Sequence, residues 1–291
     1  MSRPRALNAA ELKRHPLPPI EGGSKDARGK LLIVGGSREV AGAPIITATA
    51  AMRAGAGKVT IATVESAARL LAIAVPEARV IGLPEARGGA FARSAIPKLA
   101  ELAQDYDAIV AGPGMLPTPV ATRLAARLCE SGTALALDAA LLHGLPPAKQ
   151  AARDAEPIPI LLPHGKEMAS LLGLSEEQTA ADPLGCALEA ARRYQALVLA
   201  KGAQSHVATA GGKVWKYRGG GLGLAISGSG DGLAGILGGL LSRGTEPLTA
   251  LLWAVWLHGE AGRRLSRKIG RVGFLAREIP GEIPGLLQSA L

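Results

Sequence analysis

The sequence contains few aromatic residues and few cysteines. Phe, Trp and Tyr together make up 3% of its 291 residues, too few for the rows of stacking rings with which many proteins bind single-stranded nucleic acid. The two cysteines, Cys129 and Cys186, are too few and too far apart for a disulfide framework or a zinc site. These shortages exclude a disulfide-stapled secreted domain and indicate a reducing, cytoplasmic environment.

The sequence also lacks a long apolar run. None reaches the roughly 18 residues that a membrane-spanning helix needs, and we interpret the nearest, residues 248–257, as a buried helix that could serve the core or an interface. Residues 1–19 are basic and contain prolines but have no apolar core of signal-peptide length. We therefore expect no membrane partner.

Negative charge is in the minority. Lys and Arg number 33 and Asp and Glu 24, which gives a formal net charge of +9. Most basic residues are scattered, and we interpret the group within residues 263–271 as a solvated helix face. We therefore expect no nucleic-acid partner, whereas the positive field would favour a small polyanionic substrate.

Short apolar runs alternate with helical segments along most of the chain. This alternation predicts an α/β fold with a mostly parallel central sheet and helices on both faces. We expect a loosely structured lead-in over residues 1–25, and up to about residue 28, followed by one domain over residues 26–291. The expected strands are residues 30–34, 58–63, 79–83, 107–111, 133–137, 157–162 and 197–200, with a β-hairpin at 206–210 and 213–217. The expected helices are residues 43–57, 65–75, 90–104, 118–131, a short helix ending at 172, one opening near 231, and 249–269.

Several distinctive short motifs follow the expected strands. Ligands of open α/β sheets bind outside the carboxyl ends of the strands, so these motifs should converge on one edge of the sheet. They are Gly35-Gly-Ser37, Gly112-Pro-Gly114, Asp138, residues 164–167 and residues 201–205, together with residues 228–231.

The segment Gly228-Ser-Gly-Asp231 immediately precedes an apolar helical pattern. Glycines there let the backbone approach a ligand, and the amides and dipole of a first helical turn attract phosphate. Asp231 could be a helix cap, but a cap needs no Gly-Ser-Gly before it. The alternative is a phosphoryl anion hole in which Asp231 takes a proton from an attacking hydroxyl.

Two common nucleotide-binding folds are excluded. Gly230-x-Gly232-x-x-Gly235 matches the dinucleotide fingerprint by spelling, but it does not open the first strand–turn–helix unit, and an apolar run stands where the acidic residue should follow. The sequence also has no Gly-x-x-x-x-Gly-Lys-Ser/Thr loop, so a P-loop fold is not expected.

Other polar residues have two interpretations each. Lys201 could contact phosphate or be a surface charge, and His164 could bind a ligand or make a structural hydrogen bond. Glu167 could hold a hydrated Mg²⁺ or favour the start of its helix. Asp138 could supply a polar contact in the same cleft, and we interpret His258, with its neighbour Glu260, as structural.

Taken together, the motifs resemble those of the ADP- or ATP-dependent NAD(P)HX dehydratases, which are carbohydrate-kinase-like members of the ribokinase superfamily. The resemblance covers roughly residues 25–288. The segments that carry it are Lys30-Leu-Leu-Ile-Val-Gly-Gly-Ser37, Gly42-Ala-Pro44, Ala50-Ala-Met-Arg-Ala-Gly-Ala-Gly57, Gly112-Pro-Gly114, Pro163-His164 with Glu167, Lys201-Gly-Ala203, Gly228-Ser-Gly-Asp231 with Leu233-Ala-Gly235, and Leu257-His-Gly-Glu-Ala-Gly262.

The resemblance implies a ribokinase-like enzyme that restores NAD(P)H from its hydrate, (6S)-NAD(P)HX. A nucleotide, ADP or ATP with Mg²⁺, would phosphorylate the ring hydroxyl, and loss of phosphate would regenerate the double bond. Asp231 would be the catalytic base, and Glu167 would face the metal through water. The other implied roles are the anion hole at Gly228, Ser229 and Gly230; nucleotide binding by Lys201, Gly202, Ala203, Gln204, Ser205 and Gly230; and NAD(P)HX binding by Ala43, Gly114, His164 and Asp231.

The chain departs from the pattern of the family at several positions. Asp138-Ala-Ala140 lacks the second acid of Asp-Ala-Asp, and Gly165 and Lys166 stand where Pro and Gly are usual. Ile226-Ser227 replaces Thr-Gly, and Val40 replaces an aromatic residue. None of these changes removes the expected base or anion hole.

The resemblance also bears on partners and on alternative functions. It implies a homo-oligomer, and because the chain is too short to include the N-terminal epimerase domain of many relatives, we expect a separate NAD(P)HX epimerase. One alternative is a kinase of the same superfamily that acts on a hydroxymethylpyrimidine or thiazole alcohol. Another, suggested by Ala140, is a nucleotide-sensing or scaffold protein that has lost catalysis.

Overall fold

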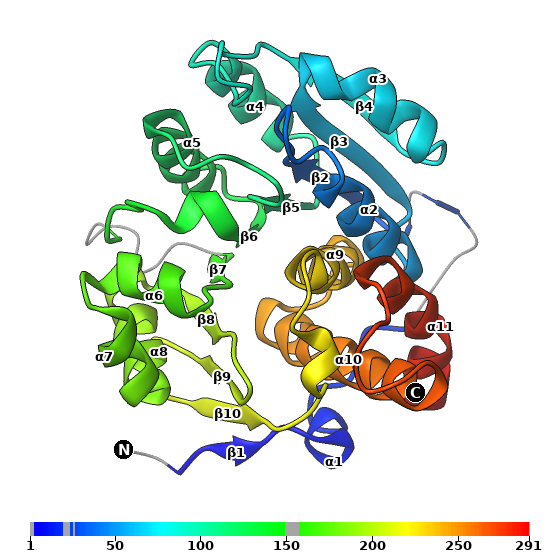
Figure 1. Cartoon of the computed structure of the whole chain (residues 1–291), viewed down its shortest axis with the longest axis vertical. Coiled ribbons are helices and arrows are strands. Elements are labelled where there is room, and N and C mark those ends of the chain that lie inside the picture. Colours follow the sequence, from blue (N-terminus) through cyan, green and yellow to red (C-terminus); the bar gives the residue numbers. More distant parts are fainter. Residues whose placement is uncertain (1–2, 20–23, 26, 149–156, 291) are drawn as a thin grey trace.

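A computed structural model of the protein describes residues 3–19, 24–25, 27–148 and 157–290. Its strands form one ten-stranded sheet in the order β1-β10-β9-β8-β7-β6-β5-β2-β3-β4 (Figure 1). Neighbouring strands run parallel except β9, which is antiparallel to both β8 and β10. The strands are β1 (Arg5–Ala6), β2 (Lys30–Val34), β3 (Lys58–Val64), β4 (Arg79–Leu83), β5 (Ala108–Ala111), β6 (Ala134–Leu137), β7 (Ile160–Leu161), β8 (Leu197–Ala200), β9 (Ser205–Ala208) and β10 (Val214–Tyr217).

Helices cover both faces of the sheet, as the alternation predicts. Helices α2, α9, α10 and α11 lie together on one side, and α4 to α8 lie on the other (Figure 1). Their bounds are α1 (Ala9–Leu12), α2 (Ala43–Arg53), α3 (Glu65–Ala74), α4 (Ala95–Ala103), α5 (Pro119–Cys129), α6 (Gly165–Leu172), α7 (Glu176–Ala181), α8 (Pro183–Tyr194), α9 (Ser229–Ser242), α10 (Pro247–Lys268) and α11 (Ile279–Ala290). Short 3-10 turns span Ala139–Leu142, Leu222–Leu224 and Ala276–Glu278.

The central strands are mostly apolar because both of their faces are covered. Leu31, Leu32, Ile33 and Val34 of β2 are completely buried, and so is every residue of β5. The mostly parallel α/β sheet expected from the sequence is therefore confirmed.

Helices α2 and α9 pack closely because both carry small residues at their contact. A Cβ placed on Gly235 would lie 2.8 Å from the Cβ of Ala50, and one on Gly239 would lie 2.9 Å from the Cβ of Ala54. Neither glycine can therefore be replaced by a larger residue without separating the helices. This close contact, which we call the glycine seam, holds the beginning of α9 in a fixed position beside α2.

The expectation of a loosely structured N-terminus is wrong for residues 3–19. Strand β1 pairs in parallel with β10, Leu7 and Leu12 join the core, and the indole Nε1 of Trp215 donates to the Glu11 carboxylate at 2.9 Å. The segment is held by partners about 200 positions away, which a local sequence pattern does not reveal. Residues 20–23 and 26 lie outside the described residues.

Other differences concern the lengths of elements. Strand β7 covers only 160–161 of the expected 157–162, and residues 149–156 before it lie outside the described part of the chain. Helix α4 begins at Ala95 instead of residue 90, because Phe91 forms a β-bridge with Glu85. Helices α7, α8 and α11 were not anticipated. Within the described residues, no helix is long and apolar enough to cross a bilayer.

Candidate active site

The motifs expected at the ends of the strands meet at one edge of the sheet. The amide of Gly36 donates to the carbonyl of Pro113 at 2.7 Å, and the amide of Lys201 donates to the carbonyl of Pro163 at 2.9 Å. Asp138, directly after β6, forms an ion pair with Lys201, directly after β8. Strand ends far apart in the sequence thus form one continuous rim, as expected for a parallel sheet.

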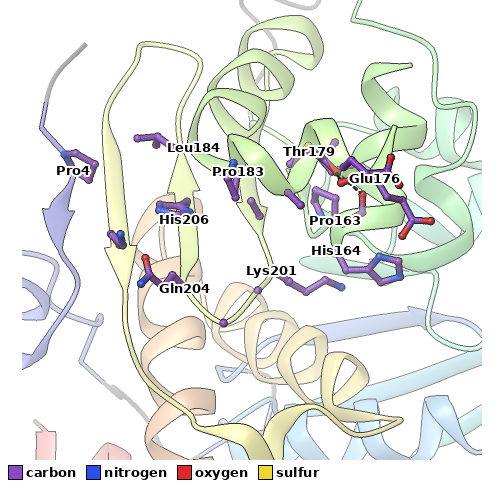
Figure 2. A pocket seen from close by; sticks show the side chains of 18 residues that line it. Pro4, Pro163, His164, Glu176, Thr179, Pro183, Leu184, Lys201, Gln204 and His206 are labelled. Atoms are coloured by element: carbon purple, nitrogen blue, oxygen red, sulfur yellow. Dashed lines mark hydrogen bonds between the residues drawn. The ribbon is translucent and has the colours of Figure 1, made fainter. Parts of the chain in front are cut away.

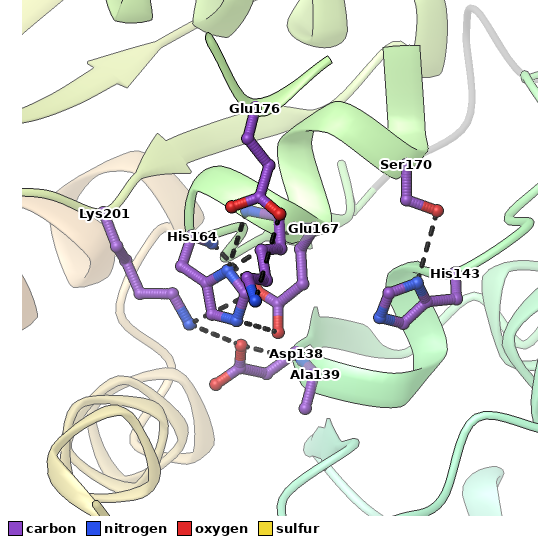
Figure 3. A network of polar contacts seen from close by, with 9 residues as sticks. Asp138, Ala139, His143, His164, Glu167, Ser170, Glu176 and Lys201 are labelled. Atoms are coloured by element: carbon purple, nitrogen blue, oxygen red, sulfur yellow. Dashed lines mark hydrogen bonds and ion pairs between the residues drawn. The ribbon is translucent and has the colours of Figure 1, made fainter. Parts of the chain in front are cut away.

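Lys201 is the centre of a charged cluster. Its Nζ lies 2.6 Å from Asp138 Oδ1 and 3.9 Å from Glu167 Oε2 (Figure 3). Burial by itself would lower the pKa of the Lys201 ammonium, but Asp138 and Glu167 outweigh burial and raise it. Lys201 therefore remains a cation inside the site, and its interpretation as a surface charge is wrong.

His164 and Glu167 together cap the beginning of helix α6. The ring Nδ1 of His164 accepts from the amide of Lys166 at 3.1 Å, while Glu167 Oε2 accepts from the amide of His164 at 2.8 Å. Because Nδ1 accepts, the ring proton is on Nε2, which lies 3.2 Å from Glu167 Oε1 (Figure 3). Both residues thus have the structural role considered above, and the buried Glu167 carboxylate also remains beside Lys201.

Helix α9 begins beside this cluster. Gly228 precedes the helix with φ of +87°, in the left-handed region that glycine adopts readily. A Cβ on Gly230 would point at the cluster, 3.7 Å from Lys201 Nζ and 3.8 Å from Asp138 Oδ2. The first turn of α9 thus presents its amides to the same edge of the sheet as Lys201.

Asp231 lies in the first turn of α9 and does not cap it. Gly228 is the cap position, and no side chain caps this helix. Burial and the Asp138 carboxylate raise the pKa of Asp231 to about 6, although the Lys201 ammonium opposes them. Asp231 thus has a pKa near neutrality, and its carboxyl group is not engaged in helix capping. These are the properties of a general base.

The other side of the α9 N-terminus faces helix α2. A Cβ on Gly228 would lie 2.8 Å from Cδ1 of Ile46 in α2. Gly114, with φ of +68°, approaches the start of the same helix, where a Cβ would lie 2.9 Å from that of Ala43. Ala43 and Gly114 are therefore neighbours at the start of α2, one helical turn before Ile46.

A cavity of about 920 Å³ opens beside Lys201 (Figure 2). Its walls come from the loop after β8, from helices α7 and α8, and from strands β9 and β10. Of the expected nucleotide-binding residues, 201–204 line it, whereas Ser205 and Gly230 do not. His164 lines the same cavity, and so does Pro4 of the N-terminal segment, which no motif predicts.

The carboxylates suit a magnesium ion that arrives with phosphate. Within the described part of the chain, no three His, Cys, Asp or Glu side chains are arranged to hold a metal by themselves. Mg²⁺ is usually bound by one or two carboxylates together with substrate phosphates. Asp138 and Glu167, both close to Lys201, are carboxylates of the kind that such an ion uses.

The departures from the family pattern leave this geometry intact. Ala140 is 4% exposed and belongs to the apolar core. Gly165 and Lys166 form the first turn of α6, where the Lys166 amide donates to His164. Val40 is exposed, and its carbonyl lies close to Gly114.

Comparison with known proteins gives a consistent result. The family model described as NAD(P)H-hydrate dehydratase matches residues 31–285. An ADP-dependent (S)-NAD(P)H-hydrate dehydratase of Xanthomonas campestris is 44% identical over 286 residues, which are 98% of this chain and 96% of that protein. A bifunctional NAD(P)H-hydrate repair enzyme of Moorella thermoacetica is 35% identical; the match covers 98% of this chain but only 54% of that protein.

Among solved structures, the ADP/ATP-dependent NAD(P)H-hydrate dehydratase of Bacillus subtilis, co-crystallized with ATP and Mg²⁺, matches with a TM-score of 0.86. It is 25% identical, and the match covers all of both chains. The agreement extends over the whole architecture described above.

Proposed function

The chain belongs to the NAD(P)H-hydrate dehydratase family, and we propose that it converts (6S)-NAD(P)HX to NAD(P)H at the expense of ADP or ATP, with release of phosphate. The observation that carries this proposal is the position of Asp231. Its carboxylate has a pKa of about 6 and lies in the first turn of α9, between the Lys201 cluster and helix α2. A base in this position would lie between a site for a phosphoryl donor and a site for an acceptor alcohol.

In the proposed reaction, Asp231 takes the proton of the substrate's ring hydroxyl as the hydroxyl oxygen attacks the terminal phosphorus of the nucleotide. The bond between that phosphorus and its bridging oxygen breaks, and the shortened nucleotide leaves. Gly228, Ser229 and Gly230 would form the anion hole for the transferred group, at the positive end of the α9 dipole. The phosphate ester then breaks at its carbon–oxygen bond, the ring loses a proton, and the double bond is restored.

The nucleotide would lie along residues 201–205 and over Gly230. Lys201 supplies a cation, and the cavity of about 920 Å³ beside it is large enough for a nucleoside. Magnesium, when bound, would neutralise phosphate charge facing Asp138 and Glu167. A bound phosphate would thus compete with Asp138 for the Lys201 ammonium.

The substrate would lie on the α2 side of the base. Ala43 and Gly114, which approach each other there, would form its wall, together with Asp231. His164, which lines the cavity beside Lys201, would contact NAD(P)HX where the nucleotide and substrate sites meet.

We also propose the cellular setting. Residues 26–291 would form the catalytic domain. The segment before them would add an edge strand, β1, to the sheet of that domain. The enzyme would act in the cytoplasm as a homo-oligomer, and the two free thiols suit a reducing compartment. Relatives named as bifunctional repair enzymes support a partnership with a separate epimerase that interconverts the hydrate epimers.

The test is to incubate the purified protein with NADHX and either ADP or ATP and to follow recovery of NADH absorbance and release of free phosphate. The proposal expects both products in equal amounts. A stable phosphorylated product would instead indicate the small-molecule kinase. Nucleotide binding without turnover at any pH would indicate the scaffold.

A further inference from the structure

His258 of helix α10 contacts Ser229, the first residue of helix α9, whose first turn is the proposed binding site for the phosphoryl group. Its Nε2 lies 3.0 Å from the backbone carbonyl oxygen of Ser229 and 3.1 Å from Ser229 Oγ. The sequence predicts only a structural role for His258. Its partner, however, belongs to the expected anion hole, so this contact bears on what Ser229 can donate to a ligand.

The carbonyl contact determines where the ring proton is. A carbonyl oxygen can only accept, so Nε2 must carry the hydrogen. Burial lowers the pKa of His258 to about 4, although the hydrogen bond to Ser229 opposes this effect, and Lys201 lowers it further. His258 is therefore a neutral imidazole with its proton on Nε2 throughout the physiological range.

This tautomer determines the direction of the Ser229 hydroxyl. Because Nε2 already bears a hydrogen, it cannot accept one from Ser229 Oγ, and the short contact must be a donation from Nε2 shared between the two Ser229 oxygens. The hydroxyl hydrogen is left to point elsewhere. The backbone amide of Ser229 donates to the carbonyl of Ile226 at 3.3 Å, so the hydroxyl is the donor that this residue has free.

We propose that His258 is a positioning residue that turns the Ser229 hydroxyl toward the transferred phosphoryl group and fixes the first turn of α9. The inference rests on the proposed function, because it presumes that a phosphoryl group occupies that turn. His258 itself does not touch the substrate or exchange protons in the reaction; it acts through Ser229. Its counterpart Asp231 is the group that titrates near neutral pH.

The first experiment compares kcat and KM for the nucleotide in His258→Leu, His258→Gln and Ser229→Ala. We expect His258→Leu to lower kcat by about 10- to 100-fold, somewhat less than the loss of a whole oxyanion donor, with KM changed by less than about threefold. Gln, whose amide can replace the Nε2 donor, should restore kcat to within about fivefold of the wild type. A kcat within twofold of wild type in His258→Leu, or no rescue by Gln, would overturn the proposal.

A double-mutant cycle separates action through the hydroxyl from general packing. In the Ser229→Ala background, His258→Leu should cost no more than about threefold in kcat, because the group it orients has already gone. Fully multiplicative effects would show that His258 acts independently of that hydroxyl and would reject the inference. His143→Leu is the matched control: it removes a histidine–serine contact of 3.2 Å to Ser170, and kcat should stay within twofold.

A second measurement does not depend on turnover. In ¹⁵N-labelled protein, the His258 resonances, assigned by their loss in His258→Gln, should show a neutral ring protonated on Nε2 that does not titrate above about pH 5. A ring protonated on Nδ1, or titration near pH 6.5, would refute the assignment of the donor. If wild-type enzyme releases no NADH while this spectrum is as expected, the proposed function fails and the local geometry stands.

Discussion

Lys201 Nζ lies 2.6 Å from Asp138 Oδ1, and this ion pair lies beside the carboxylate of Asp231. The two members act on Asp231 in opposite directions, because the Asp138 charge raises its pKa and the Lys201 charge lowers it. The balance between them, added to the effect of burial, keeps the expected base close to neutrality.

We predict that kcat/KM falls as the pH drops through about 6, where Asp231 becomes protonated. Asp138→Asn removes a charge that raises this pKa, so the acid limb of the pH profile should move to lower pH. The measurement is kcat/KM against pH for both proteins. A limb that stays in place or moves upward would contradict this electrostatic balance.

Lys201→Met should be costly to stability as well as to binding. It leaves Asp138 and Glu167, with side chains 5% and 6% exposed, as buried carboxylates without their cation. We expect the free energy of unfolding to fall by roughly 3 kcal/mol, measured by urea denaturation, with a large loss of nucleotide affinity. Lys166→Met is the control: its ion pair with Glu176 is exposed at 3.9 Å and should be worth under about 1 kcal/mol.

Asp231→Asn should abolish turnover, retain nucleotide binding and stabilise the protein. The folded-state pKa of about 6 lies above the unfolded value, so the ionised carboxylate costs stability above pH 6 and costs nothing below about pH 4. At pH 7 the variant should gain roughly 2–3 kcal/mol in free energy of unfolding, and that gain should vanish near pH 4. Activity above about one per cent of wild type would contradict the role as base.

Gly230→Ala should weaken nucleotide binding without harming the fold. Its Cβ would meet only Lys201 Nζ at 3.7 Å and Asp138 Oδ2 at 3.8 Å, which is ordinary contact distance, and helical alanine is favoured over glycine. The methyl group would, however, occupy the expected path of the phosphates. Calorimetry should show an affinity loss of about tenfold or more, given the steric cost of overpacking. Gly281→Ala, with nothing within 4 Å of its Cβ, should bind normally.

Glu11→Ala should loosen the N-terminal segment from the sheet. The substitution leaves the buried indole of Trp215 without its acceptor, at a cost of roughly 1–3 kcal/mol. Amide hydrogen exchange at residues 5–7 should accelerate, and nucleotide affinity should fall because Pro4 lines the cavity. Glu11→Gln keeps an acceptor and should behave like the wild type; equal exchange in both variants would show that this bond does not hold the segment.

The sequence predicted the central sheet and its functional edge well. Strands such as β2, β5 and β8 are buried on both faces, so nearly every residue in them must be apolar, and that signal is local. The motifs at strand ends were located for the same reason, since parallel topology gathers them. The sequence leaves the role of Asp138 open because its partner, Lys201, follows a different strand.

Elements held by distant contacts were missed. Strand β1 has two residues, and helix α1 has four, so neither shows a period, and both depend on β10 and Trp215. Helix α11 contains Pro284, which obscured its pattern. His258 was judged by its apolar neighbours in the helix, whereas its significance comes from Ser229, 29 positions earlier.

The glycine seam between α2 and α9 determines which parts of the molecule can move. Helices α2 and α9 are packed too closely at Gly235 and Gly239 to shift relative to each other. Asp231 at the start of α9 and Ala43 at the start of α2 therefore move together as one rigid body. The cleft must open for the dinucleotide to enter and for the used nucleotide to leave. This opening must therefore come from movement of the other wall, which is formed by the loop after β8 and by helices α7 and α8.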